Sequence, residues 1–254
     1  MNVLSYLEVK IVEHCNFRCR GCAAFSNIAS KSEYGIKEYE SDIKRISELL
    51  DNIYIIRLLG GEPLLSDKII DYLSITRKYL PNTNIKLVTN GYILHKMDDI
   101  FFQCLKDNSI HVDISNYVNK AIKNKQGYYI DFNKLISNNV SFRDRKTRHF
   151  EIKLDAQKNN DINVTFKNCR DRIQCNNMFH GKIYPCSTSC SIHHYDAKFN
   201  TSFFNSVNGM DIYQENLTGK DILDYLNTPI DFCKNCAEYP SIFRWKEGEA
   251  RPYD

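Results

Sequence analysis

Hydrophobic positions in the first 155 residues follow two alternating spacings. Apolar stretches interrupted by every second polar residue predict β-strands at residues 6–14, 53–60, 85–91, 109–117, 140–145 and 150–154. Apolar residues three and four positions apart predict helices at residues 38–50, 66–80, 96–107 and 131–139, with Ser66 as an N-cap and Pro81 as a stop. Because strands that alternate with helices form right-handed βαβ units, we expect an α/β fold with a parallel sheet, either barrel-like or doubly wound. Functional residues then lie where the strands end.

The pattern changes near residue 160. Helical periodicity fades, six cysteines fall between Cys169 and Cys236, and residues 176–186 indicate a hairpin with its turn near His180-Gly181. We place a boundary in the polar run at residues 156–163. This predicts a first domain at residues 1–160 and a second, cysteine-rich domain at residues 161–254.

Composition limits the setting of the protein. The chain has 254 residues, a net charge of +3 and ten cysteines. Its small, mixed charge gives no electrostatic case for a nucleic-acid or membrane partner, and no apolar run approaches the roughly 18 residues of a membrane span. The start of the chain lacks the features of a signal peptide, so we expect a cytoplasmic protein with reduced thiols. Ten cysteines there indicate metal binding or catalysis rather than disulfides.

Three cysteines, Cys15, Cys19 and Cys22, lie in one loop directly after the first predicted strand. A structural zinc site needs four ligands, usually as two separated pairs. Three close thiolates suit a [4Fe–4S] cluster with one iron open to a small chelating ligand. The alternatives are ordinary buried thiols or a zinc site completed from elsewhere. The motifs at residues 60–63 and 89–91 also follow predicted strands, which indicates one common site.

The spacing Cys-x3-Cys-x2-Cys and the Gly-Gly-Glu-Pro motif after the second strand resemble the signatures of the radical S-adenosylmethionine (SAM) enzymes, from residue 1 to about residue 155. That resemblance implies a partial, six-stranded (β/α)6 TIM-like barrel. It also implies that the three cysteines hold a [4Fe–4S] cluster that cleaves SAM to a hydrogen-abstracting 5′-deoxyadenosyl radical. The implied SAM-binding residues are Gly60, Gly61, Glu62 and Pro63 at the amino group, with Thr89, Asn90 and Ser115 as candidates for the ribose and carboxylate that are equally well explained as turn or cap residues.

One position departs from the family pattern. Many members have an aromatic residue directly before the third cysteine, where it contacts adenine, and here that position is Gly21. The adenine contact must therefore come from elsewhere, with Phe17 or Phe25 as candidates.

The second cysteine group could close a four-thiolate site. Cys169 and Cys186 flank the predicted hairpin, and Cys233 and Cys236 form a Cys-x2-Cys pair. Chemistry alone does not separate a zinc ribbon from a second iron–sulfur cluster. The arrangement resembles the twitch subdomain, the shortened SPASM domain of radical SAM enzymes. This implies an auxiliary [4Fe–4S] cluster held by these four cysteines.

Three cysteines remain outside these sets. Cys175 could replace Cys169 as the first auxiliary ligand, and Cys190 follows Cys186 by four residues. Cys104 shares a helix face with apolar residues, so we expect it to be a small core residue. We assign no role to His193, His194 and Trp245, which positions in exposed loops would explain adequately.

The predicted barrel strands place polar side chains in the interior. Alternation along the strands directs Glu8, Arg57, Asp113, Arg143 and Arg145 inward. We expect Arg143 and Arg145 to bind substrate and Glu8 or Asp113 to accept a proton. The alternative is that these charges neutralise one another, for example Glu8 with Arg57.

These features predict a radical SAM oxidoreductase that acts on a polar small molecule such as a sugar or aminocyclitol. We expect a two-electron oxidation of a carbinol, assisted by the auxiliary cluster and supplied by an electron donor such as flavodoxin or ferredoxin. One alternative is an epimerase in which Cys175 or Cys190 returns hydrogen. Another is a peptide-modifying maturase, although the early first strand leaves no room for the N-terminal peptide-recognition domain that is common there. A non-catalytic metal-binding module is the alternative from a different class.

Overall fold

A computed structural model describes residues 1–117, 130, 132–155 and 159–248. Its largest element is an eight-stranded sheet with the strand order β5-β4-β3-β2-β1-β7-β8-β9. The strands are β1 (Val3–Val12), β2 (Asn52–Gly60), β3 (Asn84–Thr89), β4 (His111–Asn116), β5 (Phe142–Lys146), β7 (Asn177–Phe179), β8 (Lys182–Tyr184) and β9 (Met210–Asp211). Strands β1 to β5 are parallel to one another and β7 is parallel to β1, whereas β8 and β9 are antiparallel. The predicted α/β fold with a mostly parallel, partial barrel-like sheet is confirmed.

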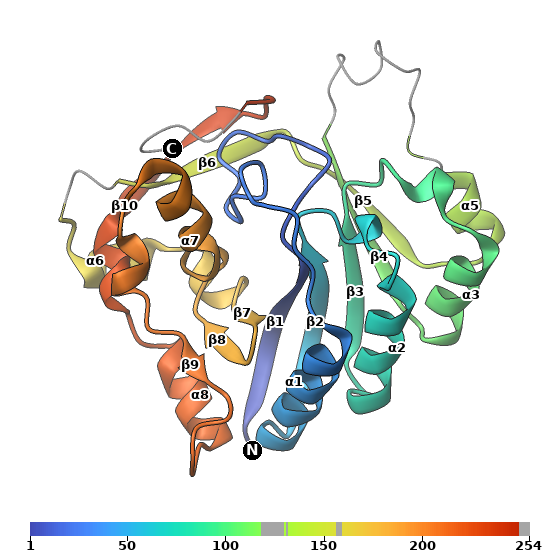
Figure 1. Cartoon of the computed structure of the whole chain (residues 1–254), viewed down its shortest axis with the longest axis horizontal. Helices are drawn as coiled ribbons and strands as arrows, with labels where there is room; N and C mark the ends of the chain where they lie inside the picture. Colours follow the sequence, from blue (N-terminus) through green and yellow to red (C-terminus); the bar gives the residue numbers. More distant parts are fainter. Residues whose placement is uncertain (118–129, 131, 156–158, 249–254) are drawn as a thin grey trace.

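Helices cover the outer face of the parallel strands (Figure 1). They are α1 (Ile36–Leu49), α2 (Ile69–Tyr79), α3 (Asp99–Asp107) and α5 (Phe132–Ser137). Leu7, Val9 and Ile11 of β1 are fully buried and belong to the same core cluster as Ile43 and Ile46 of α1. Apolar residues two positions apart on the strand and three apart on the helix thus pack into one continuous core. This core stabilises the sheet, and the site lies at the carboxyl end of that sheet.

Helix α2 begins later than the sequence predicts. Ser66 is not its N-cap, because Pro63–Leu65 first form a short 3-10 helix and Lys68 occupies the N-cap position. The Ser66 hydroxyl instead accepts a hydrogen bond from the Lys68 backbone N–H, at 3.2 Å. A serine that bonds a backbone N–H two residues on forms a local turn, and this turn has the same sequence signature as a cap.

The sixth predicted strand exists, but it does not extend the parallel sheet. Strand β6 (His149–Leu154) pairs antiparallel with β10 (Cys236–Arg244) in a separate two-stranded sheet. Only two residues connect β5 to β6. Parallel neighbours need a crossover of a dozen or more residues, so β6 cannot lie parallel beside β5.

The C-terminal region adds α6 (Ile162–Asn168), α7 (Ser187–Phe199), α8 (Gly219–Leu226) and several 3-10 turns. The predicted hairpin is confirmed: β7 and β8 are antiparallel, and His180 and Gly181 have φ values of 46° and 67°. Two consecutive residues at positive φ match the twist of a two-residue hairpin. Strands β7, β8 and β9 continue the sheet of β1, so strands from both sides of residue 160 belong to one sheet. The division into two domains at residue 160 remains a prediction.

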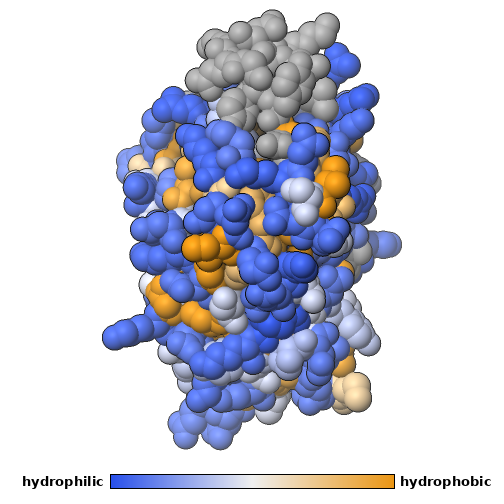
Figure 2. Space-filling view, turned by 90° about the vertical axis from the view of Figure 1, so that its right-hand side faces the viewer, coloured by the Kyte–Doolittle hydropathy of each residue, from blue (hydrophilic) through white to orange (hydrophobic). Residues whose placement is uncertain are grey.

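The surface over α3 and α5 is mostly hydrophilic, with hydrophobic side chains in small, separate patches (Figure 2). Ile100 and Ile136, on these two helices, are among the exposed hydrophobic residues, with 68% and 60% of their surface accessible to solvent. Single exposed apolar residues are normal on a protein surface. Within the described part of the chain, no helix has the length and apolar character needed to cross a membrane.

Candidate functional site

The loop after β1 brings three thiols to one pocket at the carboxyl end of the sheet. Cys15, Cys19 and Cys22 line a cavity of about 130 Å³ together with Gly60 and Gly61 at the end of β2. All ten cysteines lie within the described residues, and no other cysteine lines this cavity. Two motifs separated by almost forty residues in the sequence therefore meet at one site.

The two glycines are required by a close approach of the backbone. A Cβ atom on Gly60 would lie 1.9 Å from the carbonyl oxygen of Val12, and one on Gly61 would lie 1.9 Å from that of His14. The Gly61 N–H donates to Val12 and the Glu62 N–H donates to His14, each at 3.0 Å. These contacts attach the end of β2 to the segment that leads into Cys15, and no side chain fits between them.

Glu62 lies within the protein rather than in the cavity. Its carboxylate is fully buried and accepts hydrogen bonds from the Thr89 hydroxyl at 2.6 Å and the Asn90 N–H at 2.8 Å. Burial raises the pKa of Glu62 to about 7, although these two donors lower it in part. The side chain thus joins the end of β2 to the end of β3. Because the Glu62 carboxylate already accepts hydrogen bonds from these donors, a ligand amino group at this motif would bind main-chain carbonyl oxygens instead.

Three of the weaker SAM candidates do lie at the cavity. Thr89, Asn90 and Ser115 line it from the ends of β3 and β4. Asn90 also donates from its side-chain amide to the side-chain oxygen of Asn16 at 2.8 Å, which connects β3 to the cysteine loop. Pro63 lies outside the lining and begins the short 3-10 helix that follows β2.

The two phenylalanine candidates have different positions. Phe17 lines the cavity, with its ring centroid 5.5 Å from that of Tyr92 and 6.0 Å from that of Tyr117. Phe25 is only 4% exposed and packs in a separate core cluster against Tyr195. Of the two, Phe17 is the one placed to meet a ligand in this cavity.

The missing aromatic residue at Gly21 has a structural explanation. Gly21 has a φ of 68°, and a Cβ atom there would lie 2.8 Å from the Phe243 ring of β10. Arg20 lies over the same ring, 5.5 Å from its centroid. An aromatic residue from the C-terminal strand therefore fills the space beside the cysteine loop.

Sequence reasoning missed three aromatic residues at this site, one of which is Phe150 in the cavity lining. Tyr117 lines the cavity, and Trp245 stacks on it with ring centroids 5.5 Å apart and an interplanar angle of 14°. The Trp245 indole N–H donates to the sulfur of Cys19 at 3.1 Å. Trp245 is thus not an isolated exposed residue. The only signal in the sequence was that it is the sole tryptophan.

The thiols of the N-terminal group have the properties of metal ligands. Burial raises the pKa of Cys15, and burial followed by the charge of Cys22 raises the pKa of Cys19 to about 12. A buried thiol keeps its proton at neutral pH unless a cation replaces it, and iron supplies that positive charge. Three thiols that line one cavity, two of them with a pKa raised by burial, therefore fit a [4Fe–4S] cluster with one iron open to a ligand.

Four cysteines of the C-terminal region also lie together. Cys169 follows α6, Cys186 is the N-cap of α7, Cys233 lies in a 3-10 turn and Cys236 begins β10. Three of them, all but Cys233, line a second cavity of about 240 Å³. Burial raises the pKa of Cys236 well above its usual value, and the charges of Cys186, Cys233 and Cys169 raise it further. The four sulfurs are therefore close enough to interact electrostatically.

The remaining thiols lie elsewhere. Cys175 does not line the second cavity, and after burial its pKa is raised mainly by Glu8 of β1. Cys190 is 1% exposed; burial raises its pKa, and the charge of Lys10 lowers it in part. Cys104 is 8% exposed in the main core, as predicted. This placement favours Cys169 over Cys175 as a member of the four-thiol group.

Charged side chains on the inner face of the sheet, the face not covered by the helices, form a connected network. Arg57 donates to Asp113 at 2.8 Å and to Glu8 at 3.4 Å, and it also bonds the Tyr6 hydroxyl. Arg145 donates to the Ser115 hydroxyl at 2.6 Å. Arg57 therefore pairs with both Glu8 and Asp113, so for these residues the charges neutralise one another, as the alternative interpretation expected.

The network leaves several buried polar atoms without a hydrogen bond among the described residues. They are Nε of Arg57, Oδ1 of Asp113, Nε of Arg145 and Oδ1 of Asn177, a β7 residue whose side-chain N–H donates to Glu8 at 3.2 Å. Arg145 Nε and Asp113 Oδ1 face one another at 3.8 Å, too far for a hydrogen bond. Buried polar atoms in native proteins almost always have partners, so this group marks a place for water or a polar ligand. Arg143 is exposed on β5 and is not part of the network.

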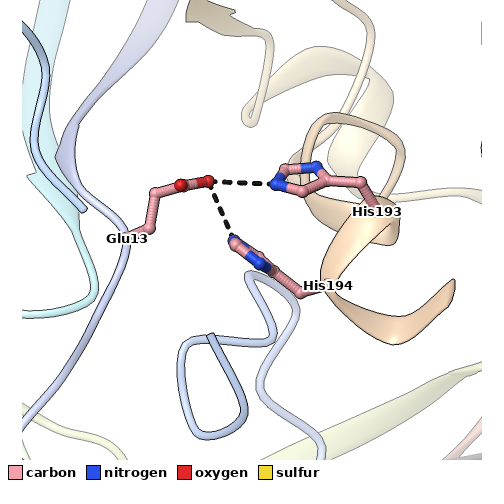
Figure 3. A group of neighbouring side chains, drawn as sticks. All are labelled: Glu13, His193 and His194. Atoms are coloured by element: carbon pink, nitrogen blue, oxygen red, sulfur yellow. Dashed lines mark hydrogen bonds and ion pairs between the residues drawn. The ribbon is translucent and has the colours of Figure 1, made fainter. Parts of the chain in front are cut away.

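A further group lies next to the cysteine loop. Glu13 accepts hydrogen bonds on one oxygen from His193 at 3.2 Å and His194 at 2.8 Å (Figure 3). Burial alone would raise the pKa of Glu13, but the bonds and charges of the two histidines lower it. The three ligand atoms lie within 4.8 Å of one another, a set that could hold zinc or ferrous iron.

This group also corrects a prediction. His193 and His194 lie on α7 and not in an exposed loop, and His194 has only a 10% exposed side chain. Glu13 precedes Cys15 by two residues, and α7 begins directly after Cys186. The contact thus connects the elements that carry the two cysteine groups.

Comparison with known proteins places the chain. Among curated relatives, the GTP 3′,8-cyclase of Campylobacter fetus subsp. fetus is 35% identical over 106 residues, which are 41% of this chain and 32% of the cyclase. The enzyme of the same name from Trichodesmium erythraeum is 29% identical over 134 residues, which are 49% of this chain and 40% of that protein. The aligned part thus spans less than half the length of these relatives.

Solved structures give weaker likenesses. BtrN in complex with AdoMet and 2-DOIA is 15% identical, with a TM-score of 0.47, and the match covers 94% of this chain and 98% of BtrN. At such a TM-score the likeness assigns no function. The family rests on the sequence itself: residues 9–146, more than half of the chain, match the Radical SAM superfamily. Together with the signature cysteines at one pocket, this match shows that the chain belongs to the radical SAM superfamily.

Proposed function

We propose that this radical SAM enzyme oxidises a carbinol of a polar, hydroxyl-rich small molecule, such as a sugar or aminocyclitol, by two electrons. The observation that carries the proposal is a group of buried polar atoms, on Arg57, Asp113, Arg145 and Asn177, that have no hydrogen-bond partner in the described part of the chain. Hydroxyl groups both donate and accept hydrogen bonds, so one polyol could satisfy guanidinium donors and carboxylate or amide acceptors together.

The N-terminal pocket supplies the SAM site in this proposal. Cys15, Cys19 and Cys22 bind a [4Fe–4S] cluster, and the backbone at Gly60 and Gly61 receives the SAM amino group. Thr89, Asn90 and Ser115 bind its polar groups, and Phe17 contacts the adenine. When bound, SAM and this cluster supply the hydrogen-abstracting 5′-deoxyadenosyl radical, and an auxiliary cluster supplies an electron acceptor.

The C-terminal cysteines form the auxiliary site. Cys169, Cys186, Cys233 and Cys236 provide the four thiolates that a closed [4Fe–4S] cluster needs. Their mutual electrostatic influence supports one shared site. The cysteine layout is similar to that of the 2-deoxy-scyllo-inosamine dehydrogenase of butirosin biosynthesis, and this likeness in layout supports an auxiliary cluster at these four cysteines.

Interior residues then bind and deprotonate the substrate. Arg145 is half-exposed at the end of β5 and donates to Ser115 of the cavity, so it links the two parts of the site. Burial raises the pKa of Glu8, which favours proton uptake by this carboxyl, and Asp113 is the second candidate base. The balance is one hydrogen atom to the radical, one proton to the base and one electron to the acceptor, which converts the carbinol to a carbonyl.

One observation favours a second reaction on the same substrate class. The Cys175 thiol lies near Glu8, outside the four-cysteine cavity. A free thiol beside the interior could return a hydrogen atom to a substrate radical, and the electron donor and a proton would then restore the thiol from its thiyl radical, so that the net reaction on the substrate is an epimerisation.

The experiment uses the anaerobically reconstituted enzyme with dithionite, flavodoxin or ferredoxin as reductant. The proposal predicts about eight irons per chain and reductant-dependent 5′-deoxyadenosine. Candidate sugars, aminocyclitols and, for comparison with the cyclases, GTP are then supplied in deuterated water. An oxidised product supports dehydrogenation, and deuterium retained at carbon supports epimerisation. Turnover of GTP alone overturns the polyol proposal.

A matched pair of variants tests the interior. Arg145→Met should reduce substrate oxidation about tenfold or more and largely preserve substrate-independent SAM cleavage, because it removes a guanidinium from the substrate site and at the SAM site removes only its hydrogen bond to the Ser115 hydroxyl. Lys146→Met, at the neighbouring exposed position of β5, is the control. Equal oxidation rates in both variants would contradict the assignment of Arg145.

A further inference from the structure

The sole tryptophan of the chain lies against the N-terminal cysteine loop. The Trp245 indole N–H donates to Cys19 Sγ at 3.1 Å. Its ring stacks on Tyr117, which lines the same cavity as the three cysteines. An indole nitrogen has no acceptor role, so the direction of this hydrogen bond is fixed from nitrogen to sulfur.

The backbone holds this tryptophan in place on both sides. The Trp245 N–H donates to the Arg148 carbonyl at 2.9 Å, and Gly248 N–H donates to the Arg18 carbonyl at 2.7 Å. Between them, Arg20 N–H donates to Lys246 at 3.2 Å. The C-terminal segment therefore pairs with the cysteine loop along residues 18–20, and the contact of the indole with Cys19 does not depend on one flexible side chain alone.

A second observation places this segment at the cluster loop. Gly21 leaves its space to Phe243, whose ring would lie 2.8 Å from a Cβ atom there. Phe243 and Trp245 are two residues apart on one extended segment. Two aromatic residues of this segment thus contact the loop on either side of Arg20.

We propose that Trp245 is a positioning residue that sets the reduction potential of the N-terminal cluster through its hydrogen bond to the Cys19 sulfur. The inference rests on the proposed cluster ligation by Cys15, Cys19 and Cys22. Reduction adds negative charge to the cluster and its sulfur ligands. An N–H donor stabilises that charge, so the bond raises the potential and eases the electron transfer that SAM cleavage requires.

The main test compares wild type with Trp245→Phe, which keeps an aromatic ring for Tyr117 and removes the N–H. The reduced N-terminal cluster is identified by the change in its paramagnetic resonance signal when SAM is added. We expect its midpoint potential to fall by an amount equivalent to about a tenfold change in the one-electron equilibrium constant, which is about 59 mV. The potential of the auxiliary cluster should not change. An unchanged potential of the N-terminal cluster overturns the proposal.

A sharper variant is available because the chain has one tryptophan. Replacing it biosynthetically with β-(3-benzothienyl)alanine exchanges the N–H for a sulfur atom in a ring of the same shape. The same fall in potential is expected, so this protein decides the question if Trp245→Phe fails to hold a cluster. An unchanged potential here also overturns the proposal.

A fluorescence readout separates this inference from the proposed function. Assembly of the N-terminal cluster should quench Trp245 emission by more than half, and a Cys15→Ala, Cys19→Ala, Cys22→Ala triple variant with only the auxiliary cluster should stay fluorescent. A cluster that assembles without quenching refutes the position of Trp245. Failure of any cluster to form on the three N-terminal cysteines refutes the proposed function instead.

Discussion

The two cysteine groups are built in different ways. The N-terminal group comes from one loop of eight residues, attached to the end of β2 by backbone hydrogen bonds at Gly61 and Glu62. The C-terminal group gathers four cysteines from the end of α6, the start of α7, a 3-10 turn and the start of β10. A site made by one loop depends on local backbone geometry. A site made by distant elements depends on the packing of the whole region.

The difference also separates their chemistry. Only three thiols line the N-terminal cavity, which also carries polar residues from β3 and β4. The C-terminal group has four interacting thiols. Three ligands leave an iron open for a substrate-like ligand, whereas four close the site. We therefore expect cofactor cleavage at the first group and electron transfer or stabilisation at the second.

Removing one thiol from each group should give the largest and most distinct effects. Cys19→Ala should abolish 5′-deoxyadenosine formation and leave about four irons on the chain, because the auxiliary site is intact. Cys236→Ala should also leave about four irons, keep SAM cleavage and lose substrate oxidation. Iron content and product analysis of both variants check this. Loss of SAM cleavage in both would show that the two groups are not separate in function.

Gly61→Ala tests the local construction of the N-terminal site. The new Cβ would lie 1.9 Å from the His14 carbonyl, so we expect a loss of stability of about 3 kcal/mol or more and weaker SAM binding. Gly35→Ala is the control, because its Cβ would lie 3.7 Å from the nearest atom. Thermal unfolding and SAM titration measure both effects. Similar results for the two glycines would contradict the close approach.

Glu62 should make the stability of the N-terminal site depend on pH. Burial raises the pKa of Glu62 from 4.5 to about 7 in the folded protein, so its protonated form is favoured by folding. Its stabilising contribution is complete below about pH 4.5 and is lost as the pH rises through 7, a change of about 3 kcal/mol.

Anaerobic unfolding of wild type and Glu62→Gln at pH 5 and pH 8 checks this dependence. The wild type should lose stability relative to the variant between the two values. Glu215→Gln, at an exposed position, serves as the control and should show no such difference. Parallel pH profiles for wild type and Glu62→Gln would show that this carboxyl does not titrate in the range.

The smallest effect is expected at the contact between the two regions. His194→Ala removes one of two donors to the largely buried Glu13 carboxylate and should lower stability by about 1–2 kcal/mol. The potentials of both clusters should change little. His149→Ala, exposed on β6, is the control. A larger loss, accompanied by loss of bound zinc or iron beyond the two clusters, would show that the group holds a metal ion.

Much of the fold was predictable because its signals are local. The strand and helix spacings, the hairpin at His180-Gly181 and the core position of Cys104 each depend on neighbours within a few residues. The predictions were wrong where one local sequence pattern is compatible with two different structures. Ser66 forms a turn instead of a cap, and β6 is a strand whose partner is β10 rather than β5.

The sequence by itself determined the N-terminal site, because three ligands in one loop and two glycines after a strand need only the parallel order of β1 and β2 to meet. Tertiary structure alone decided which residues complete it. Trp245 and Phe243 reach the loop from more than 200 residues away, and Arg57 of β2 joins Glu8 of β1 to Asp113 of β4. Such contacts depend on how distant elements pack, and neither spacing nor composition along the chain records that packing.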